Sequence, residues 1–331
     1  MERKSITIAG NIIVDQNKYI ETYPHEGHLS YVNNSYSTMG GCVPNTSVTL
    51  KSIDQNLDVR ALGSIGKDED GQYALSYFKE HNINTENVEI LENEKTSHVD
   101  AYINTSNAKR TFFVQQGASK SFGKKLLPVT TTHLHVGYLL LLPYMDEILE
   151  NGRTRMSFWL EEQQKKGIII SCDMVSEESD RYQKVITSAL PFINYMIINE
   201  IEASKLAGIE VYQDNILSVD QLILCAKAIK AMGIKNAVII HAPHLGLIYD
   251  GKDSYVLSSL KVPHEDIVNS VGAGDAFCAA TLYGILNDYQ PYDILRLASC
   301  VAADVLMSQT PKPNLKDLKS FFALENKYGR R

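Results

Sequence analysis

The sequence predicts an α/β protein with a mostly parallel central sheet that helices cover on both faces, as three layers. Short apolar runs rich in β-branched residues recur at residues 5–9, 57–62, 133–137, 168–172, 195–198 and 237–241. Helix-like stretches lie between these runs, at residues 45–53, 71–80, 153–166, 200–207 and 219–232. Apolar strands that alternate with helices are typical of a parallel sheet with two buried faces.

The ends of these elements carry residues that terminate helices and strands. Pro44 suits the first turn of a helix that continues to residue 53. Gly137 closes a predicted strand, and Gly167 and Gly233 follow predicted helices. The chain after Gly272 is predicted to be mostly helical, beginning with an apolar helix at residues 276–286.

Two stretches depart from this alternation. Residues 19–36 contain four tyrosines among polar residues, and residues 96–117 alternate like two antiparallel strands joined by a turn at residues 104–107. We expect a small discontinuous β lid formed by about residues 14–38 and 96–117; the alternative is one exposed edge hairpin. Because no repeat or Pro/Gly/Ser-rich linker divides the chain, residues 1–331 are predicted to form a single domain.

Composition excludes several classes of function. The net charge of −7 over 331 residues argues against nucleic acid as the main partner. The five cysteines are scattered and form no C-x-x-C pair, which fits a reducing cytosol. The longest apolar run is too short to span a bilayer, and the first residues show no signal-peptide pattern. We therefore expect a cytoplasmic protein without a membrane partner.

The most informative motif is Gly272-Ala273-Gly274-Asp275, at the start of the apolar helix. Small residues let backbone N–H groups approach an anion, and the helix N-terminus favours negative charge. Asp275 beside such a site could take a proton from an attacking hydroxyl, as phosphoryl transfer requires. The alternative is an ordinary glycine turn with an aspartate in the first helical turn.

Two further motifs are weak alone. The pair Gly40-Gly41, followed by Asn45, permits close backbone approach and offers hydrogen bonds to a polyhydroxylated ligand. Asn199 and Glu202 follow a predicted strand, at the sheet edge where ligands bind in open α/β sheets. Each also fits a purely structural role as a loop or helix cap.

The order of these motifs resembles the ribokinase (PfkB-type) family of sugar and nucleoside kinases, over roughly residues 6–321. The resemblance implies a ribokinase-like three-layer fold with a β lid that closes over substrate and often mediates dimerisation. It implies that Asp275 is the catalytic base and that Val271, Gly272, Ala273 and Gly274 form the anion hole. Asn199 and Glu202 would organise Mg²⁺ through water, together with the ATP phosphates.

The resemblance also assigns the remaining contacts. ATP would be bound by Asn199, Glu202, His241, Gly246 and Ser299. Substrate hydroxyls would be contacted by residues from four segments: Asn11, Asp15, Gly40, Gly41, Asn45 and Tyr138.

Several positions depart from the family pattern. Cys42 stands where ribokinases have Lys, Ile13 where they have Asn, and Tyr138 where a sugar-binding Glu is common, which argues against ribose as the substrate. On the nucleotide side, His241 replaces Thr and Pro243 replaces Gly, so one backbone N–H is lost. Residues 308–311 lack the glycines of the family's cation loop, which makes activation by a monovalent cation doubtful.

These observations predict an ATP-dependent sugar kinase that phosphorylates a hydroxyl, preferably primary, of a monosaccharide or related polyol, with Mg²⁺ as cofactor. Its partners would be the sugar, ATP and a second copy of the chain paired through the lid. One alternative is a nucleoside kinase of the same family, whose aromatic lid stacks on a base. The other is a catalytically silent sensor of sugar or nucleotide, suggested by the altered nucleotide segment.

Overall fold

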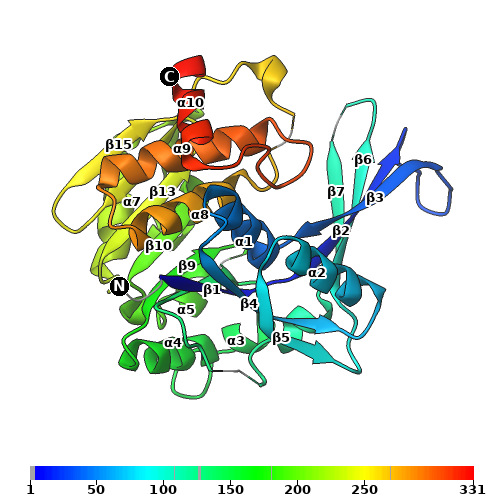
Figure 1. Cartoon of the computed structure of the whole chain (residues 1–331), viewed down its shortest axis with the longest axis horizontal. Coiled ribbons are helices and arrows are strands. Elements are labelled where there is room, and N and C mark those ends of the chain that lie inside the picture. The colour runs from blue at the N-terminus through cyan, green and yellow to red at the C-terminus, as the bar shows by residue number, and fades with distance from the viewer. Residues whose placement is uncertain (1–3, 108, 126–127, 180, 269) are drawn as a thin grey trace.

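The central sheet of the computed structural model has nine strands, and its spatial order crosses the chain order repeatedly (Figure 1). The structure describes residues 4–107, 109–125, 128–179, 181–268 and 270–331, so the predicted domain and lid ranges include a few residues outside this set. From one edge to the other the strands are β15 (Ser254–Ser258), β14 (Leu245–Tyr249), β13 (Ala237–Ala242), β10 (Tyr195–Asn199), β9 (Ile169–Met174), β8 (His133–Leu139), β1 (Ser5–Gly10), β4 (Asp58–Gly66) and β5 (Asn84–Leu91).

Seven of these strands run parallel, and β14 and β15 add an antiparallel edge. The side chains of β10 show why helices must cover both faces. Met196 and Ile198 pack into one apolar cluster and Ile197 into the other, because successive side chains of a strand point to opposite faces. The three-layer α/β class predicted from the sequence is therefore confirmed.

The helices divide between the two faces. One layer packs on the cluster that includes Ile197 and contains α1 (Cys42–Ile53), α2 (Glu69–Glu80), α8 (Ala273–Leu286), α9 (Pro291–Leu306) and α10 (Leu318–Tyr328). The opposite layer contains α3 (Pro143–Asp146), α4 (Arg155–Lys165), α5 (Arg181–Ile186), α6 (Glu200–Ala207) and α7 (Val219–Ala231). Figure 1 shows α8 and α9 on one side of the sheet and α4 on the other.

A second, four-stranded sheet projects from this body (Figure 1). Its order is β3 (Val32–Gly40), β2 (Ile13–Ile20), β6 (Ser97–Asn104) and β7 (Arg110–Gln115). β2 pairs antiparallel with β3 and parallel with β6, and β6 and β7 form an antiparallel hairpin. The two segments whose sequences depart from the alternation of strands and helices thus pair in one small sheet. A two-stranded ribbon, β11 (Tyr212–Gln213) and β12 (Ile216–Leu217), precedes α7.

The largest differences between the predicted and observed helix bounds are at the N-termini of α8 and α1. α8 begins at Ala273, three residues before the predicted start, because Gly272 adopts a left-handed conformation as its N-cap. α1 begins at Cys42 instead of residue 45, after Gly41 with φ 85°. Glycine takes positive φ at little cost, so both helices start directly after a glycine.

Candidate active site

The carboxylate of Asp275 lies in the first turn of α8, held by residues from two other elements. The side chain is only 8 % exposed. The hydroxyl of Tyr138, in β8, donates to both carboxylate oxygens at 2.8 and 3.0 Å. Nδ2 of Asn45, in α1, donates to Oδ2 at 2.9 Å. These hydrogen bonds fix the orientation of the carboxylate.

Burial dominates the electrostatics of Asp275. Its pKa is raised to about 7, mainly by burial and in addition by the nearby carboxyl of Asp173, although the hydrogen bonds from Asn45 and Tyr138 lower it. A carboxyl with this pKa is more basic than an ordinary aspartate and is still partly ionised at neutral pH. Such a group suits the role of a general base.

The turn of residues 271–274 separates two cavities. Val271 lines the first cavity, of about 560 Å³, and Ala273 and Gly274 line the second, of about 520 Å³. A Cβ at Gly272 would lie 2.6 Å from Cβ of Pro311, so only glycine fits there. The first N–H groups of any α-helix have no intrahelical partner, and together with the helix dipole they favour an anion at this end.

The first cavity lies against the small sheet and is both polar and aromatic. Asp15, Asn17 and Thr38 contribute polar groups, and Tyr19 and Tyr36 contribute neighbouring rings that are tilted by 30°, with centroids 5.9 Å apart. Asn17 donates from Nδ2 to Oγ1 of Thr38 at 3.1 Å. This wall offers hydrogen bonds and flat apolar surface to one small molecule.

Asp15 is a partly buried acid of the first cavity. Its pKa is raised to about 7, mainly by removal from water and in addition by the charge of Asp275. The two carboxyls are therefore electrostatic neighbours, although they come from β2 and α8. A Cβ at Gly40 would collide with the Asp15 carboxylate, and a Cβ at Gly41 would lie 2.6 Å from the backbone oxygen of Asn11. Gly40 thus allows close packing against Asp15, and Gly41 allows close packing against Asn11.

Three residues predicted to contact substrate make hydrogen bonds within the protein. Asn45 and Tyr138 both donate to Asp275, as described above. Asn11 uses both ends of its amide: Nδ2 donates to the backbone oxygen of Leu141 at 3.0 Å, and Oδ1 accepts from the Tyr138 N–H at 2.9 Å. Asn11 therefore fixes the chain segment that carries Tyr138.

The second cavity lies on the other side of the turn and is mostly apolar. Asn199, His241 and Ser299, all predicted to bind ATP, line it, together with Pro243. A Cβ at Gly274 would lie 3.2 Å from Cε1 of His241, so the imidazole packs against the start of α8. Burial lowers the His241 pKa to about 4, which keeps the ring neutral.

Asn199 and Glu202 form a capping box at the start of α6. Asn199 accepts from the Glu202 N–H at 2.8 Å, and Glu202 accepts from the Asn199 N–H at 2.9 Å and from Ser176 Oγ at 2.8 Å. Glu202 is 4 % exposed, and burial raises its pKa to about 8. Because the Glu202 carboxylate is buried in the capping box, its position suits contact with hydrated Mg²⁺ through water better than direct coordination of the ion.

Gly246, the remaining residue predicted to bind ATP, has a packing role. It lies in β14 and pairs with His241 of β13. A Cβ at this position would lie 2.9 Å from Cδ2 of Leu295 and 3.0 Å from Cζ of Phe277. The glycine therefore lets α8 and α9 approach the sheet beside the second cavity.

Sequence reasoning missed several residues of both cavities. Arg110 and Phe112, in β7, line the first cavity, and Arg331 lines the second. Phe112 and Phe113 are neighbours in β7, and of the two Phe112 lines the cavity. Arg331 carried no signal, since it reaches the cavity only because its N–H bonds the backbone of Ser259.

Among the described ranges, no helix has the length and apolar character that crossing a lipid bilayer demands.

Residues 3–316 match the family model of the pfkB family carbohydrate kinase. The chain is 21 % identical over 306 residues to a ribokinase of Dictyostelium discoideum, covering 90 % of this chain and 93 % of that one. Among solved structures it is similar to Arabidopsis thaliana ribokinase complexed with ribose and ATP (TM-score 0.82, 18 % identity, 97 % and 98 % of the two chains). It is also similar to Burkholderia thailandensis nucleoside kinase in complex with inosine (TM-score 0.75, 18 % identity, 99 % and 100 %).

Proposed function

Because the chain belongs to the pfkB family of carbohydrate kinases, we propose that it transfers the γ-phosphate of Mg·ATP to a primary hydroxyl of a monosaccharide or related polyol. The observation that carries this proposal is the position of Asp275. Its carboxylate lies at the helix N-terminus that separates the two cavities. An acceptor in the first cavity and a nucleotide in the second would meet at this carboxylate.

In the proposed reaction Asp275 takes the proton of the acceptor hydroxyl as its oxygen attacks the γ-phosphorus. The bond between that phosphorus and the β–γ bridging oxygen breaks, and ADP leaves. The N–H groups of residues 271–274 and the dipole of α8 stabilise the charge on the phosphoryl group in transfer. Asn45 and Tyr138 act as positioning residues, because they touch the base and hold its orientation.

Mg²⁺ would neutralise charge on the ATP phosphates. Asn199 lines the second cavity, and Glu202 lies directly behind it in the capping box, so we propose that the pair acts on the hydrated ion through water.

The first cavity supports a polar acceptor. Asp15, Asn17 and Thr38 offer the donors and acceptors that sugar hydroxyls need. A nucleoside is the second candidate, favoured by Tyr19 and Tyr36, whose rings could stack on a base.

We propose that the small sheet acts as a lid over the first cavity and pairs with a second copy of the chain. Its edge strand β7 exposes Phe112, Phe113 and Val114, each more than half accessible to solvent. Exposed apolar edge strands are templates for pairing between chains. The five buried, unpaired cysteines support the proposal of a reducing, cytosolic location.

The proposal is tested by ADP release from Mg·ATP across a panel of sugars, sugar acids, polyols and nucleosides. Sugar acids are included because Arg110 lines the cavity. Asp275→Asn should reduce kcat by more than tenfold, a change of about 1.4 kcal/mol, while ATP still stabilises the protein thermally. Asp220→Asn is a matched control, since Asp220 also lies in a first helical turn but is exposed.

Each outcome of this panel has a definite meaning. One strong substrate, lost in Asp275→Asn and retained in Asp220→Asn, supports the kinase and identifies its acceptor. An Asp275→Asn variant that keeps more than about a tenth of kcat contradicts the role of Asp275 as the base. If no compound of the panel leads to ADP release, but one of them raises the melting temperature, the result favours a sensor without catalytic activity.

A further inference from the structure

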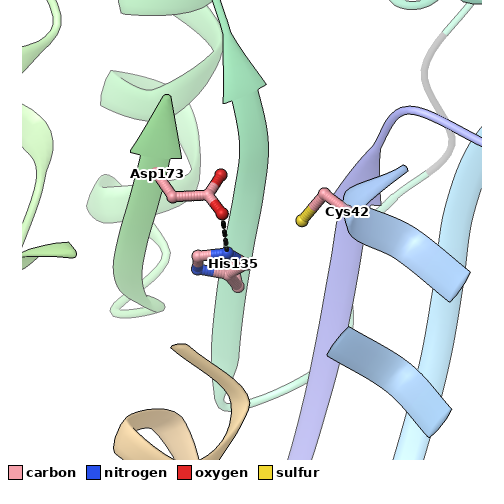
Figure 2. A group of neighbouring side chains, drawn as sticks. All are labelled: Cys42, His135 and Asp173. Carbon is pink, nitrogen blue, oxygen red and sulfur yellow. Dashed lines mark ion pairs between the residues drawn. The ribbon is translucent and has the colours of Figure 1, made fainter. Parts of the chain in front are cut away.

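A compact group of three side chains with different donor atoms lies in the interior, behind the catalytic carboxylate. Figure 2 shows Asp173 of β9 pointing toward His135 of β8, with the sulfur of Cys42, at the start of α1, facing both. One donor atom from each residue lies within 4.8 Å of the other two. All three residues are buried. They come from three elements, so the fold assembles the group.

Asp173 is a buried acid whose side chain lacks the hydrogen bonds that such a group usually has. Its Oδ1 atom is inaccessible to solvent and has no hydrogen-bond partner among the described residues. Its Oδ2 atom lies 3.7 Å from Nε2 of His135, which is beyond hydrogen-bond distance. A buried carboxylate without donors costs several kcal/mol unless it is protonated or bound to a cation.

The surrounding donors are those of a transition-metal site. Zn²⁺ binds thiolate sulfur at about 2.3 Å and imidazole nitrogen or carboxylate oxygen at about 2.0–2.2 Å, usually with four ligands. In a tetrahedron of such bonds, neighbouring ligand atoms lie roughly 3.3–3.8 Å apart. The 3.7 Å between Oδ2 of Asp173 and Nε2 of His135 falls in this range.

We propose that Cys42, His135 and Asp173 form a binding site for one Zn²⁺ ion. All three residues are buried, so the ion would be held in the interior of the protein. A thiolate and a carboxylate beside a neutral imidazole would give the soft, anionic donor set that selects zinc over Mg²⁺. The site is distinct from the Mg²⁺ that accompanies ATP.

The imidazole of His135 is already in the state that a metal needs. Nδ1 of His135 lies 2.9 Å from Oγ of Ser171, which orients the ring and leaves Nε2 facing the group. Burial lowers the His135 pKa to about 3, so the ring is neutral. Zinc binding would release the protons of the Cys42 thiol and the Asp173 carboxyl.

The proposed zinc ligands lie next to the residues that orient the Asp275 carboxylate. The charge of Asp173 raises the pKa of Asp275, so the two carboxyls are close enough to interact electrostatically. A Cβ at Gly137 would collide with Asp173 and lie 2.6 Å from the Cys42 sulfur, and the next residue, Tyr138, donates to Asp275. A bound ion would therefore brace the chain segment that orients the base.

The test is zinc binding by the untagged full chain, refolded with Zn²⁺ and then dialysed, because a buried site fills most readily during folding. About one zinc per chain is expected, and Co²⁺ in its place should give the visible and thiolate charge-transfer absorption of a tetrahedral thiolate site. Cys42→Ser and Asp173→Asn should each weaken binding by at least tenfold. Cys225→Ser removes another buried thiol, hydrogen-bonded to Ile209, and should leave binding unchanged.

Two results would overturn the proposal. One is a wild-type chain that, refolded with zinc, holds less than about a tenth of an ion. The other is Cys42→Ser that binds zinc as tightly as Cys225→Ser. The wild-type stoichiometry and Co²⁺ spectrum need no variant, so the test stands even if a substitution prevents folding.

Discussion

The hydrogen bonds to Asp275 set how strong a base it is. Tyr138 donates to both oxygens and, by stabilising the ionised form, lowers the pKa that burial raises to about 7. Asn45 acts in the same direction from the opposite side. The activity of the enzyme should therefore rise with pH through the neutral range, as the carboxylate forms.

Tyr138→Phe tests this arrangement without removing the base. Loss of the hydroxyl should raise the Asp275 pKa, so the midpoint of the rise in kcat with pH should move to higher pH. At pH 7 kcat should fall several-fold and then recover in alkaline buffer, which a purely structural defect would not do. The measurement is kcat against pH for both proteins; an unchanged midpoint would argue against control of the base by Tyr138.

At the same scale, the sequence pattern led to the proposed role of Asp275 but did not reveal its hydrogen-bond partners. Asp275 was identified from its position after small residues at a helix start, which is a local pattern. Its partners Tyr138 and Asn45 are 137 and 230 residues away in the chain, so the sequence alone could not show that they touch it. The contacts of Tyr138 and Asn45 with Asp275 depend on how β8 and α1 pack against α8.

The N-terminus of α8 is the element on which the proposed transfer depends. Gly272 has φ 83°, and a Cβ there would lie 2.8 Å from Cα of Pro311. Both the left-handed backbone and the close approach therefore require glycine.

Gly272→Ala should destabilise the protein by more than the roughly 1–2 kcal/mol that a left-handed conformation costs a side chain, and kcat should fall because the turn shifts. Gly152→Ala is the matched control, since Gly152 has φ 78° and open space around the position of a Cβ. Urea unfolding of both variants measures the difference. Equal destabilisation would mean that contact with Pro311 does not constrain the turn.

At the scale of elements, periodicity predicted the buried strands and most helices of the α/β core. It missed β5, β14 and β15, which lie toward the edges of the sheet. β15 is only partly buried along its length, so its sequence lacks the continuous apolar run of β1. Edge strands are held by pairing with a neighbour, which a single-sequence pattern does not reveal.

For the whole molecule, several buried acids should make stability fall as pH rises. The pKa values of Asp15 and Asp275 are raised to about 7, that of Asp146 to about 6 and that of Glu202 to about 8, in each case mainly by burial. Between pH 5 and 8 the folded chain binds more protons at these sites than the unfolded chain. The contribution of these acids to the free energy of unfolding therefore decreases as pH rises through these pKa values, and it outweighs the opposite contribution of the three histidines with lowered pKa values, His133, His135 and His241.

We expect a melting temperature at least about 2 °C higher at pH 5.5 than at pH 8, since about 1 kcal/mol moves it by a few degrees in a chain of this size. Asp15→Asn should flatten this slope, because it removes one of the titrating groups. Differential scanning fluorimetry across this pH range measures both proteins. A melting temperature that climbs with pH would contradict the assignment of these acids as protonated in the folded state.

Assembly is a second property of the whole molecule. If β7 pairs with a second copy, light scattering should give twice the mass of one chain. Phe113→Lys should shift the population toward monomer, since Phe113 is 58 % exposed on this strand. Tyr292→Lys, at a similarly exposed aromatic residue of α9, should remain dimeric. A wild-type monomer at micromolar concentration would contradict pairing through the lid.

The turn of residues 271–274 stands between the two cavities as a partition with a space on each side. Neither space has to empty before the other fills, so a single molecule could occupy both. A bisubstrate analogue that joins the acceptor to a nucleotide through a phosphate bridge would bind its second half at a high effective concentration. Its affinity should exceed that of either half by about 10²–10⁴-fold, with the bridge lying against the start of α8.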